Sequence, residues 1–359
     1  MARRDWMIRE SELLDDIQLD VLRETIGKSL VVSGCAGSGK SVLALIKAQH
    51  LQSREKNYEV IVFTKALCQY MDSGRNELKL NGPIFYYQEW KNRGMPQADY
   101  VIVDEIQDFT REEIEEFIEA AREHFFFFGD TAQSIYNGLP DGNGGDKKTM
   151  PVDNIRDLFP PDSKPKSFEL YRNYRLPKAV AKLVQHIGVD LPEYVDNRYK
   201  STETAVPYIL GYKTEEEQLN TIKETIQQKS LTDVAVLLPQ NEFVKDVANK
   251  LTQLGLNCEM KYNDKQNWHN NQETLNFSTE NVKVMTYHSA KGLQFETVFL
   301  PYMERYNAFR PSARTSLYVA ATRAYKNLYF LYSGPMPSIF GQIDSSLYKT
   351  STTETVDDI

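Results

Sequence analysis

The sequence predicts an α/β fold built from parallel sheets whose faces are covered by helices. In both halves of the chain, short apolar runs alternate with stretches of helical periodicity, the order expected when a crossing helix joins each strand to the next. The run Phe125–Phe128 has no polar position, as expected for a strand buried on both faces. With 359 residues, the chain is long enough for two domains of ordinary size.

The predicted elements follow one another in a regular order. First-half strands are expected at residues 30–33, 60–64, 84–87, 100–104 and 125–129, with a helix at 111–122. Second-half strands are expected at 206–210, 233–238, 282–286, 297–301 and 327–331, with helices at 215–227, 242–254 and 312–323. From 136 to 166 the periodicity disappears, and turn formers and prolines predict a mobile surface excursion leading into a linker. We expect an N-terminal domain over residues 1–165, a C-terminal domain over 166–345 and a polar, acidic tail over 346–359.

The composition is that of a soluble globular protein. Hydrophobic residues make up 41% of the chain, and no apolar stretch is long enough to span a bilayer or to follow Arg3 and Arg4 as a signal core. We therefore expect a cytoplasmic protein without membrane contact. The net charge of -8 argues against a broad basic nucleic-acid surface but leaves a narrow basic groove open. The cysteines and histidines lack the spacing of a zinc site.

A glycine-rich segment, GCAGSGKS at residues 34–41, carries the strongest functional signal. It fits the phosphate-loop template, follows an apolar run and opens a helical pattern. Backbone N–H groups in such a loop turn toward a phosphate, and the helix N-terminus adds partial positive charge. The lysine can reach the β- and γ-phosphates, and the serine hydroxyl can join the shell of Mg²⁺. A plain turn would not explain Lys and Ser at these offsets. The residues expected to bind phosphate are Gly34, Gly37, Ser38, Gly39, Lys40 and Ser41.

Polar residues also follow two other predicted strands. Asp104 and Glu105 come directly after residues 100–103, where one carboxylate can hold Mg²⁺ and the other can act as general base on the attacking water. These residues could instead cap the following helix, but the upstream phosphate loop favours the catalytic interpretation. Gln133, after residues 125–129, is our candidate for sensing the γ-phosphate, since a neutral amide does not compete for the metal.

Arginines in the second half could complete such a site. The segment YRNYR at residues 171–175 suits base stacking and phosphate contact, although a solvated loop is the simpler interpretation of that segment alone. Arg323 lies in a largely apolar helical stretch, and a buried guanidinium needs an anion. An arginine supplied by a second domain to a γ-phosphate would meet that need.

Taken together and in this order, the segments resemble the superfamily 1 helicases of the UvrD, Rep and PcrA type. The matching segments are GCAGSGKS, DEIQD, GDTAQSIY, NYR, HSAKGLQF and VAATRA, and they extend from about Leu14 to Leu331. The resemblance implies two RecA-like P-loop NTPase domains, each a mainly parallel sheet flanked by helices. It also implies that ATP and Mg²⁺ bind between them and that the protein moves along single-stranded DNA.

The resemblance assigns further roles by position. Gln18 would read the adenine edge, Tyr174 would stack on the adenine, and Gln294 would bind a ribose hydroxyl. Arg175 and Arg323 would contact the γ-phosphate from the second domain. The residues that fall where the family touches DNA are Phe63, Thr64, Tyr136, Thr286 and His288.

Three departures from the family pattern matter. Gln294 replaces a family Glu, with a modest expected effect. Asn137 follows Tyr136 close to where the family usually has a Trp, and because stacking contributes about 1–3 kcal/mol per base, we expect a weaker grip on DNA. The stretches 71–100 and 177–281 leave little room for accessory subdomains, so this is a minimal form of the family.

We therefore expect an ATP-dependent motor on single-stranded DNA, with 3′-to-5′ direction if it translocates and with RNA left open as a substrate. It would act in repair or antiphage defence with a partner such as a nuclease. The alternative is an ATP-gated switch that binds DNA or a partner without travelling. A small-molecule kinase would also use the phosphate loop, but it leaves Arg323 and the Tyr174-Arg175 pair unexplained.

Overall fold

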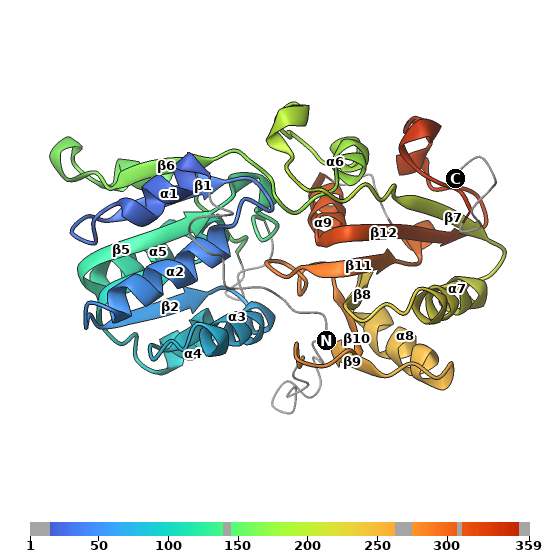
Figure 1. Cartoon of the computed structure of the whole chain (residues 1–359), viewed down its shortest axis with the longest axis horizontal. Helices are drawn as coiled ribbons and strands as arrows, with labels where there is room; N and C mark the ends of the chain where they lie inside the picture. Colours follow the sequence, from blue (N-terminus) through green and yellow to red (C-terminus); the bar gives the residue numbers. More distant parts are fainter. Residues whose placement is uncertain (1–14, 139–144, 263–274, 307–310, 352–359) are drawn as a thin grey trace. The chain divides into compact units, whose positions relative to one another are not determined.

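The chain forms two compact α/β units. The computed structural model describes residues 15–138, 145–262, 275–306 and 311–351 (Figure 1). The units divide between Tyr174 and Arg175. Each contains one six-stranded sheet in which every pairing between the named strands is parallel, with helices packed against it. The predicted fold class, two RecA-like domains of parallel sheet and flanking helices, is confirmed.

In the first unit, the phosphate-loop strand lies inside the sheet. The strand order is β3 (Ile84–Tyr86), β2 (Tyr58–Val62), β4 (Ala98–Val103), β5 (Ala121–Gly129), β1 (Leu30–Gly34) and β6 (Lys166–Leu170). The helices are α1 (Asp16–Arg23), α2 (Lys40–Gln52), α3 (Lys65–Glu77), α4 (Tyr87–Asn92) and α5 (Arg111–Ala120). Strand β5 separates β1 from β4, with Phe127 paired to Val31 on one side and to Val103 on the other. This central position explains why Phe125–Phe128 are all apolar and at most 4% exposed.

Local signals in the sequence start the helices of this unit. Thr110 and Glu113 form a reciprocal capping box at the start of α5, and Asp15 and Gln18 form another at the start of α1. Thr64 caps α3 by accepting a hydrogen bond from Leu67 N at 3.1 Å. Helix α5 then buries Ile114 and Phe117, one helical turn apart, in the core with Phe127.

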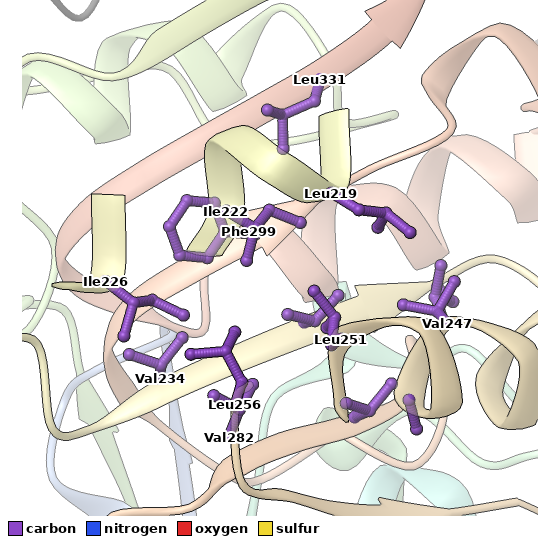
Figure 2. Packing of buried hydrophobic residues seen from close by; sticks show 14 of the residues in the cluster. Leu219, Ile222, Ile226, Val234, Val247, Leu251, Leu256, Val282, Phe299 and Leu331 are labelled. Carbon is purple, nitrogen blue, oxygen red and sulfur yellow. The ribbon is translucent and has the colours of Figure 1, made fainter. Parts of the chain in front are cut away.

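The second unit repeats this layered arrangement. The strand order is β7 (Tyr208–Tyr212), β12 (Ala324–Ser333), β11 (Phe295–Leu300), β8 (Val234–Leu238), β10 (Val282–Thr286) and β9 (Cys258–Lys261). The helices are α6 (Lys178–Gln185), α7 (Glu215–Gln228), α8 (Asn241–Gln253) and α9 (Pro311–Ala321). Figure 2 shows the core between helices and sheet, where Ile222 of α7 and Leu251 of α8 pack in one cluster with β-strand residues such as Phe299. Their burial removes apolar surface from water and holds the helices on the sheet.

Two predicted boundaries are wrong because strand pairing extends past them. Residues 121 and 122, expected to end a helix, belong to β5, since Ala121 pairs with Ala98. The domain boundary expected after residue 165 lies after Tyr174, because residues of β6 pair with β1 in the first sheet.

Two segments predicted to lie outside the domains contribute to them. The expected surface excursion contains a 3₁₀ helix at Val152–Leu158, whose Val152 and Ile155 are fully buried. The expected tail begins inside the second unit, since Lys349 N donates to Pro207 O and Lys349 O accepts from Ile209 N, each at 2.9 Å. Its last residues, 352–359, lie outside the described part of the chain.

Candidate active site

The first-unit candidates gather at one edge of the sheet. Because all its strands are parallel, their carboxyl ends meet at the same edge, which is where open α/β sheets bind ligands. The phosphate loop follows β1, and Asp104 follows β4 directly. The residues that follow the other strands of this edge are Phe63 and Thr64 after β2, Asp130 and Gln133 after β5, and Asn173 after β6.

The phosphate loop has the backbone that its glycines predict. Gly37 and Gly39 have φ values of 70° and 87°, in the left-handed region that glycine adopts without strain. A side chain at Gly34 would place Cβ 2.8 Å from Ser38 Oγ and from Leu170 Cβ, so no larger residue fits there. The glycines of the loop are therefore required both for its backbone conformation and for its close packing against Ser38 and Leu170.

Lys40 is buried at the mouth of this loop. Its Nζ donates to Gly34 O at 2.9 Å and to Cys35 O at 3.0 Å. A bound phosphate would offer a stronger acceptor than these two neutral carbonyls. The ammonium is thus held within the loop that a triphosphate would occupy.

The segment after β6 holds the phosphate loop from the other side. Asn173 Nδ2 donates to Ala36 O at 2.5 Å, and Tyr174 N donates to Gly37 O at 2.9 Å. Cys35 N in turn donates to Leu170 O at 3.1 Å. Sequence reasoning assigned Tyr174 to the second domain and missed Asn173, because nothing local to the sequence says that β6 lies beside β1.

Gln18 and Tyr174 meet through Asp15. Asp15 accepts from Gln18 N at 2.8 Å and from Tyr174 Oη at 2.7 Å, and Gln18 Nε2 donates to Ser38 O at 2.8 Å. Burial, together with the neighbouring Asp15 carboxylate, raises the pKa of Tyr174 to about 12, so the ring is neutral at physiological pH. The amide oxygen of Gln18 accepts from Asp15 N at 3.0 Å, so any reading of a base by this oxygen has to compete with the capping box.

Asp104 presents an unsatisfied carboxylate oxygen. The residue is fully buried, and its Oδ1 accepts from Glu105 N at 3.0 Å. Within the described residues, its Oδ2 has no hydrogen-bond partner. Burial, and then the adjacent Glu105 carboxylate, raise the pKa of Asp104 to about 7, while the Ser41 hydroxyl and Lys40 oppose that rise. A buried carboxylate oxygen beside a serine hydroxyl suits Mg²⁺, which favours oxygen ligands and retains several waters, so these residues fit the metal.

Glu105 is the first residue of a buried polar network. Its φ is 58°, a left-handed conformation that is uncommon outside glycine. Gln107 Nε2 donates to Glu105 Oε2, and Gln107 Oε1 accepts from Asp130 N at 2.9 Å. Gln133 Nε2 donates to Asp130 Oδ2 at 2.6 Å. The structure therefore links the predicted base to the predicted sensor through Gln107 and Asp130, which sequence reasoning did not select.

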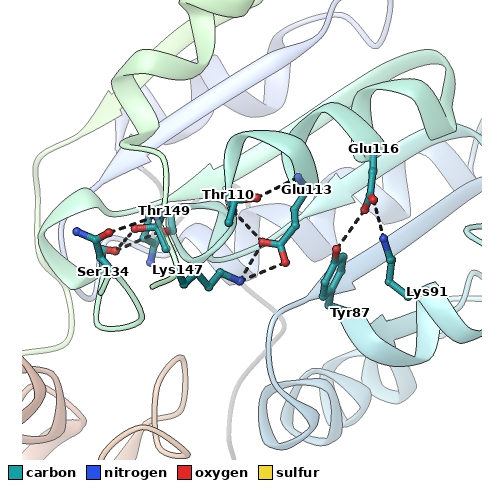
Figure 3. Close-up of polar contacts among 10 residues, drawn as sticks. Tyr87, Lys91, Thr110, Glu113, Glu116, Ser134, Lys147 and Thr149 are labelled. Atoms are coloured by element: carbon teal, nitrogen blue, oxygen red, sulfur yellow. Dashed lines mark hydrogen bonds and ion pairs between the residues drawn. The ribbon is translucent and has the colours of Figure 1, made fainter. Parts of the chain in front are cut away.

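The first-unit candidates for nucleic-acid contact lie in an aromatic cluster. The ring of Phe63 is 4.4 Å from that of Tyr136 and 5.1 Å from that of Phe109, centroid to centroid. Lys147 Nζ lies 4.5 Å from the Phe63 centroid. It also lies 2.9 Å from Glu113 Oε2, a contact drawn in Figure 3. Lys147 was not among the predicted site residues. Thr64 also caps α3, so its side chain has a structural role as well.

In the second unit, the nucleotide candidates lie at the amino edge of the sheet. Gln294 and Arg323 come directly before β11 and β12, and Phe295 N donates to Arg323 O at 2.9 Å. Arg323 is 1% exposed, and its guanidinium donates to Val319 O, Leu293 O and Thr322 Oγ1. Arg175 Nε donates to Gln294 Oε1 at 3.0 Å, which brings two of the predicted residues into contact.

The second-unit nucleic-acid candidates lie at the other edge of that sheet. Thr286 ends β10, and its Oγ1 accepts from Ser289 N at 3.1 Å, which closes a turn. Burial, and then the Lys291 ammonium, lower the pKa of His288, so its imidazole is neutral at neutral pH. Residues 287–294 lead from this edge back to the start of β11, so one segment connects the two groups of candidates.

The described residues contain neither a cluster of metal ligands nor a membrane-spanning helix. Over residues 15–351, apart from the gaps given above, no group of three or more His, Cys, Asp or Glu side chains is arranged to hold a metal ion. Across the same described residues, no helix combines the length and apolar character that crossing a bilayer requires.

Comparisons with known proteins find helicase models in both units. Residues 30–142 match the viral superfamily 1 RNA helicase core domain, and residues 264–334 match the UvrD-like helicase C-terminal domain. A curated relative, RecBCD enzyme subunit RecB of Chlamydia pneumoniae, is 40% identical over 62 residues, which are 17% of this chain and 6% of that protein.

Solved structures of helicases are also similar. The C-terminal domain of a possible DNA helicase from Lactobacillus plantarum WCFS1 is 18% identical, with a TM-score of 0.38, over 49% of this chain and 98% of that chain. The helicase nonstructural protein 10 of an arterivirus is 15% identical, with a TM-score of 0.43, over 90% of this chain and 63% of that chain. A helicase family model matches in each unit, in the order of the motifs, and these matches support the assignment to helicase superfamily 1.

Proposed function

We propose that this superfamily 1 NTPase is an ATP-dependent motor on single-stranded DNA, with Mg²⁺ as its metal. Its direction would be 3′-to-5′, if it translocates, and its location cytoplasmic. The observation that carries the proposal is the convergence of a lysine-bearing phosphate loop, a buried Asp104 with an unsatisfied oxygen and the network from Glu105 to Gln133 at one sheet edge.

Each proposed site residue of the first unit has its own role in ATP hydrolysis. Lys40 exchanges its two loop carbonyls for the β- and γ-phosphates, and the loop N–H groups bind the remaining phosphate oxygens. Ser41 and Asp104 hold Mg²⁺, which when bound neutralises charge on the phosphates. Glu105 accepts the proton of the attacking water, and Gln133 donates to the transferred phosphate. The products are ADP and inorganic phosphate.

Gln18 and Tyr174 are proposed to bind the adenine. Their shared contact with Asp15, next to the Ser38 carbonyl of the phosphate loop, supports this assignment. Gln18 Oε1 accepts from Asp15 N, and Gln18 Nε2 donates to Ser38 O. Because an amide NH₂ carries two hydrogens, we propose that Gln18 recognises the base through the second hydrogen on Nε2. Gln294 is proposed to bind a ribose hydroxyl.

Arg175 and Arg323 are proposed to contact the γ-phosphate. The burial of the Arg323 guanidinium just before β12, close to Leu293, which precedes Gln294 in the chain, supports this role, because a buried guanidinium gains from meeting an anion. Arg323→Ala should lower kcat more than it weakens ATP binding, because the contact strengthens as charge develops on the phosphate. Arg305→Ala, at a partly exposed ion pair with Glu215, is the matched control. A loss confined to ATP affinity would contradict this role.

The nucleic-acid contacts are proposed at Phe63, Thr64 and Tyr136 in the first unit and at Thr286 and His288 in the second. The test of the whole proposal is ATP hydrolysis measured with single-stranded DNA, duplex DNA and single-stranded RNA, each at about 50 and about 200 mM salt. Stimulation by single-stranded DNA that weakens with salt is the expected result. Equal rates with and without nucleic acid would reject the motor, and stimulation by RNA alone would change its substrate. Single-stranded RNA is included as a candidate substrate because the family model matched in the first unit is that of an RNA helicase core.

A nucleotide-gated switch is the second candidate. The contacts of the Phe63 ring with Tyr136 and Lys147 favour the switch, because both side chains must move away before a base can stack on Phe63. ATP-dependent binding to DNA without displacement of a blocker bound downstream would support the switch. Displacement that requires hydrolysis would support the motor.

A partner protein, such as a nuclease, is proposed on the match to RecB, a subunit of the RecBCD enzyme. Affinity purification of a tagged chain from its native cells, followed by mass spectrometry, tests this. Recovery of the tagged chain alone would count against a stable partner.

A further inference from the structure

We propose that Gln107 is a positioning residue that couples the general base to the phosphate-sensing segment. The inference rests on the proposed function, because it takes Glu105 as the base and Gln133 as the sensor. It adds a residue to that site, and it states how a change at one end reaches the other.

The buried side chain of Gln107 contacts both the segment that follows β4 and the segment that follows β5. It is fully buried after β4. Its Nε2 donates to Glu105 Oε2, and its Oε1 accepts from Asp130 N at 2.9 Å. Its main-chain oxygen also accepts from Ser134 Oγ at 3.3 Å. A residue that follows β4 is therefore bound at two points to the segment that follows β5.

The side of the network that faces the base is under strain. Glu105 has φ 58° and ψ 42°, a conformation that a residue with a side chain keeps only where its surroundings impose it. The Gln107 amide constrains the side chain of this residue, because a donor on Oε2 fixes the orientation of the carboxylate. The base then meets the attacking water without first searching among rotamers.

The side that faces the sensor is equally fixed. Asp130 accepts from Ala132 N at 3.1 Å and from Gln133 Nε2 at 2.6 Å. When Gln133 turns toward a phosphate it gives up its bond to Asp130 Oδ2, and the Asp130 carboxylate, which Ala132 N still holds through Oδ1, can shift. Because Asp130 N holds Gln107 Oε1, this movement reaches Glu105 through a single amide.

The Gln107 amide packs closely against Gly129. A Cβ added at Gly129 would lie 2.5 Å from Gln107 Oε1 and 2.7 Å from Ile106 Cγ2. The glycine at the end of β5 thus allows the amide to bridge the two strand ends. A glutamine that served only to satisfy Asp130 N would not also need to direct its donor at Glu105.

Two substitutions at Gln107 distinguish the contribution of its Nε2 donor from that of its Oε1 acceptor. Gln107→Glu keeps an acceptor for Asp130 N but loses the donor to Glu105, and Gln107→Met loses both. We expect each to lower kcat about 10²-fold, the loss typical of a displaced catalytic group, and to leave the Kd for a fluorescent ATP analogue unchanged. Gln88→Met, on the exposed face of α4, is the matched control. Thermal unfolding identifies any variant that does not fold.

Coupling is tested by adding Gln133→Ala. The double variant with Gln107→Met should be no slower than the slower single variant, because residues that act as a unit are not additive. Unchanged kcat in Gln107→Glu, or fully multiplicative losses in the double variant, would overturn the inference. If the wild-type chain binds no ATP analogue and hydrolyses no ATP, the proposed function itself fails, and this inference fails with it for a different reason.

Discussion

Lys47 offers a quantitative test of how the first unit is held together. Its ammonium is fully buried on α2, donates to Leu22 O at 3.3 Å and to Glu24 O at 2.8 Å, and lies 5.5 Å from the centroid of the Phe126 ring. A cation at the carboxyl end of α1 complements the helix dipole. Because α1 also carries Gln18, this lysine fixes the helix that we assign to the adenine.

The cost of this burial depends on pH in a direction that can be worked out. Burial lowers the pKa of Lys47 from 10.5 to about 8, so the folded chain releases this proton more readily than the unfolded chain. The penalty is present in full below pH 8 and disappears as pH rises toward 10.5. At about 1.4 kcal/mol per pH unit, it amounts to roughly 3 kcal/mol.

The perturbation is Lys47→Met, which keeps the length of the side chain and removes the charge. The wild-type free energy of unfolding, minus that of the variant, should rise by roughly 3 kcal/mol from below pH 8 to near pH 10.5. Equilibrium urea unfolding, followed by circular dichroism at a series of pH values, measures this difference. Taking the difference removes the titration of tyrosines and of other lysines, which both proteins share.

Lys148→Met, at an exposed position of the same unit, is the control and should give a difference that does not vary with pH. A flat difference for Lys47→Met would refute the reasoning, because it would mean that the ammonium is as well solvated in the folded chain as in the unfolded one. A difference that falls with pH would show that the carbonyls and the ring stabilise the charge more than burial opposes it.

The remaining predictions concern the site and its supports. Lys40→Ala should abolish ATP hydrolysis, and normal turnover in a phosphate-release assay would contradict its role. Glu105→Gln should retain binding of an ATP analogue but stop hydrolysis, so turnover close to the wild-type rate would exclude it as the base. Thr110→Ala removes the cap of α5 and should lower the free energy of unfolding in urea by about 1 kcal/mol. An unchanged free energy of unfolding would contradict a stabilising role for this cap. Lys147→Met should lower the free energy of unfolding by about 1–2 kcal/mol, because the contacts of Lys147 with Glu113 and Phe63 are lost. A loss equal to that of the exposed Lys148→Met would refute a stabilising role for these contacts.

Most of the arrangement of the first-unit candidate site could be predicted because its signals are local. The turn of the phosphate loop depends on glycines at fixed offsets, and the structure gives Gly37 and Gly39 the left-handed conformations that this requires. Capping residues such as Thr110 also act within one helical turn. The position of Asp104 follows from an apolar strand that ends in a carboxylate.

The contacts that depend on the order of strands could not be predicted. Asn173 holds the phosphate loop because β6 pairs with β1, and this pairing also moves the domain boundary past residue 165. Val152 and Ile155, three residues apart and so on one face of a 3₁₀ helix, enter the core, although this helix is too short to give a recognisable periodicity in the sequence.

The sequence by itself determined the α/β class, the phosphate loop and the acidic residues beside it, because each is encoded in a few consecutive residues. Only the tertiary structure decided that Gln107 would join Glu105 to Asp130, and that Lys147 would lie on Phe63. The physical reason is that these contacts form between chain ends that parallel strands bring to one edge. Strand order is set by the packing of the whole sheet and not by the spacing of any single motif.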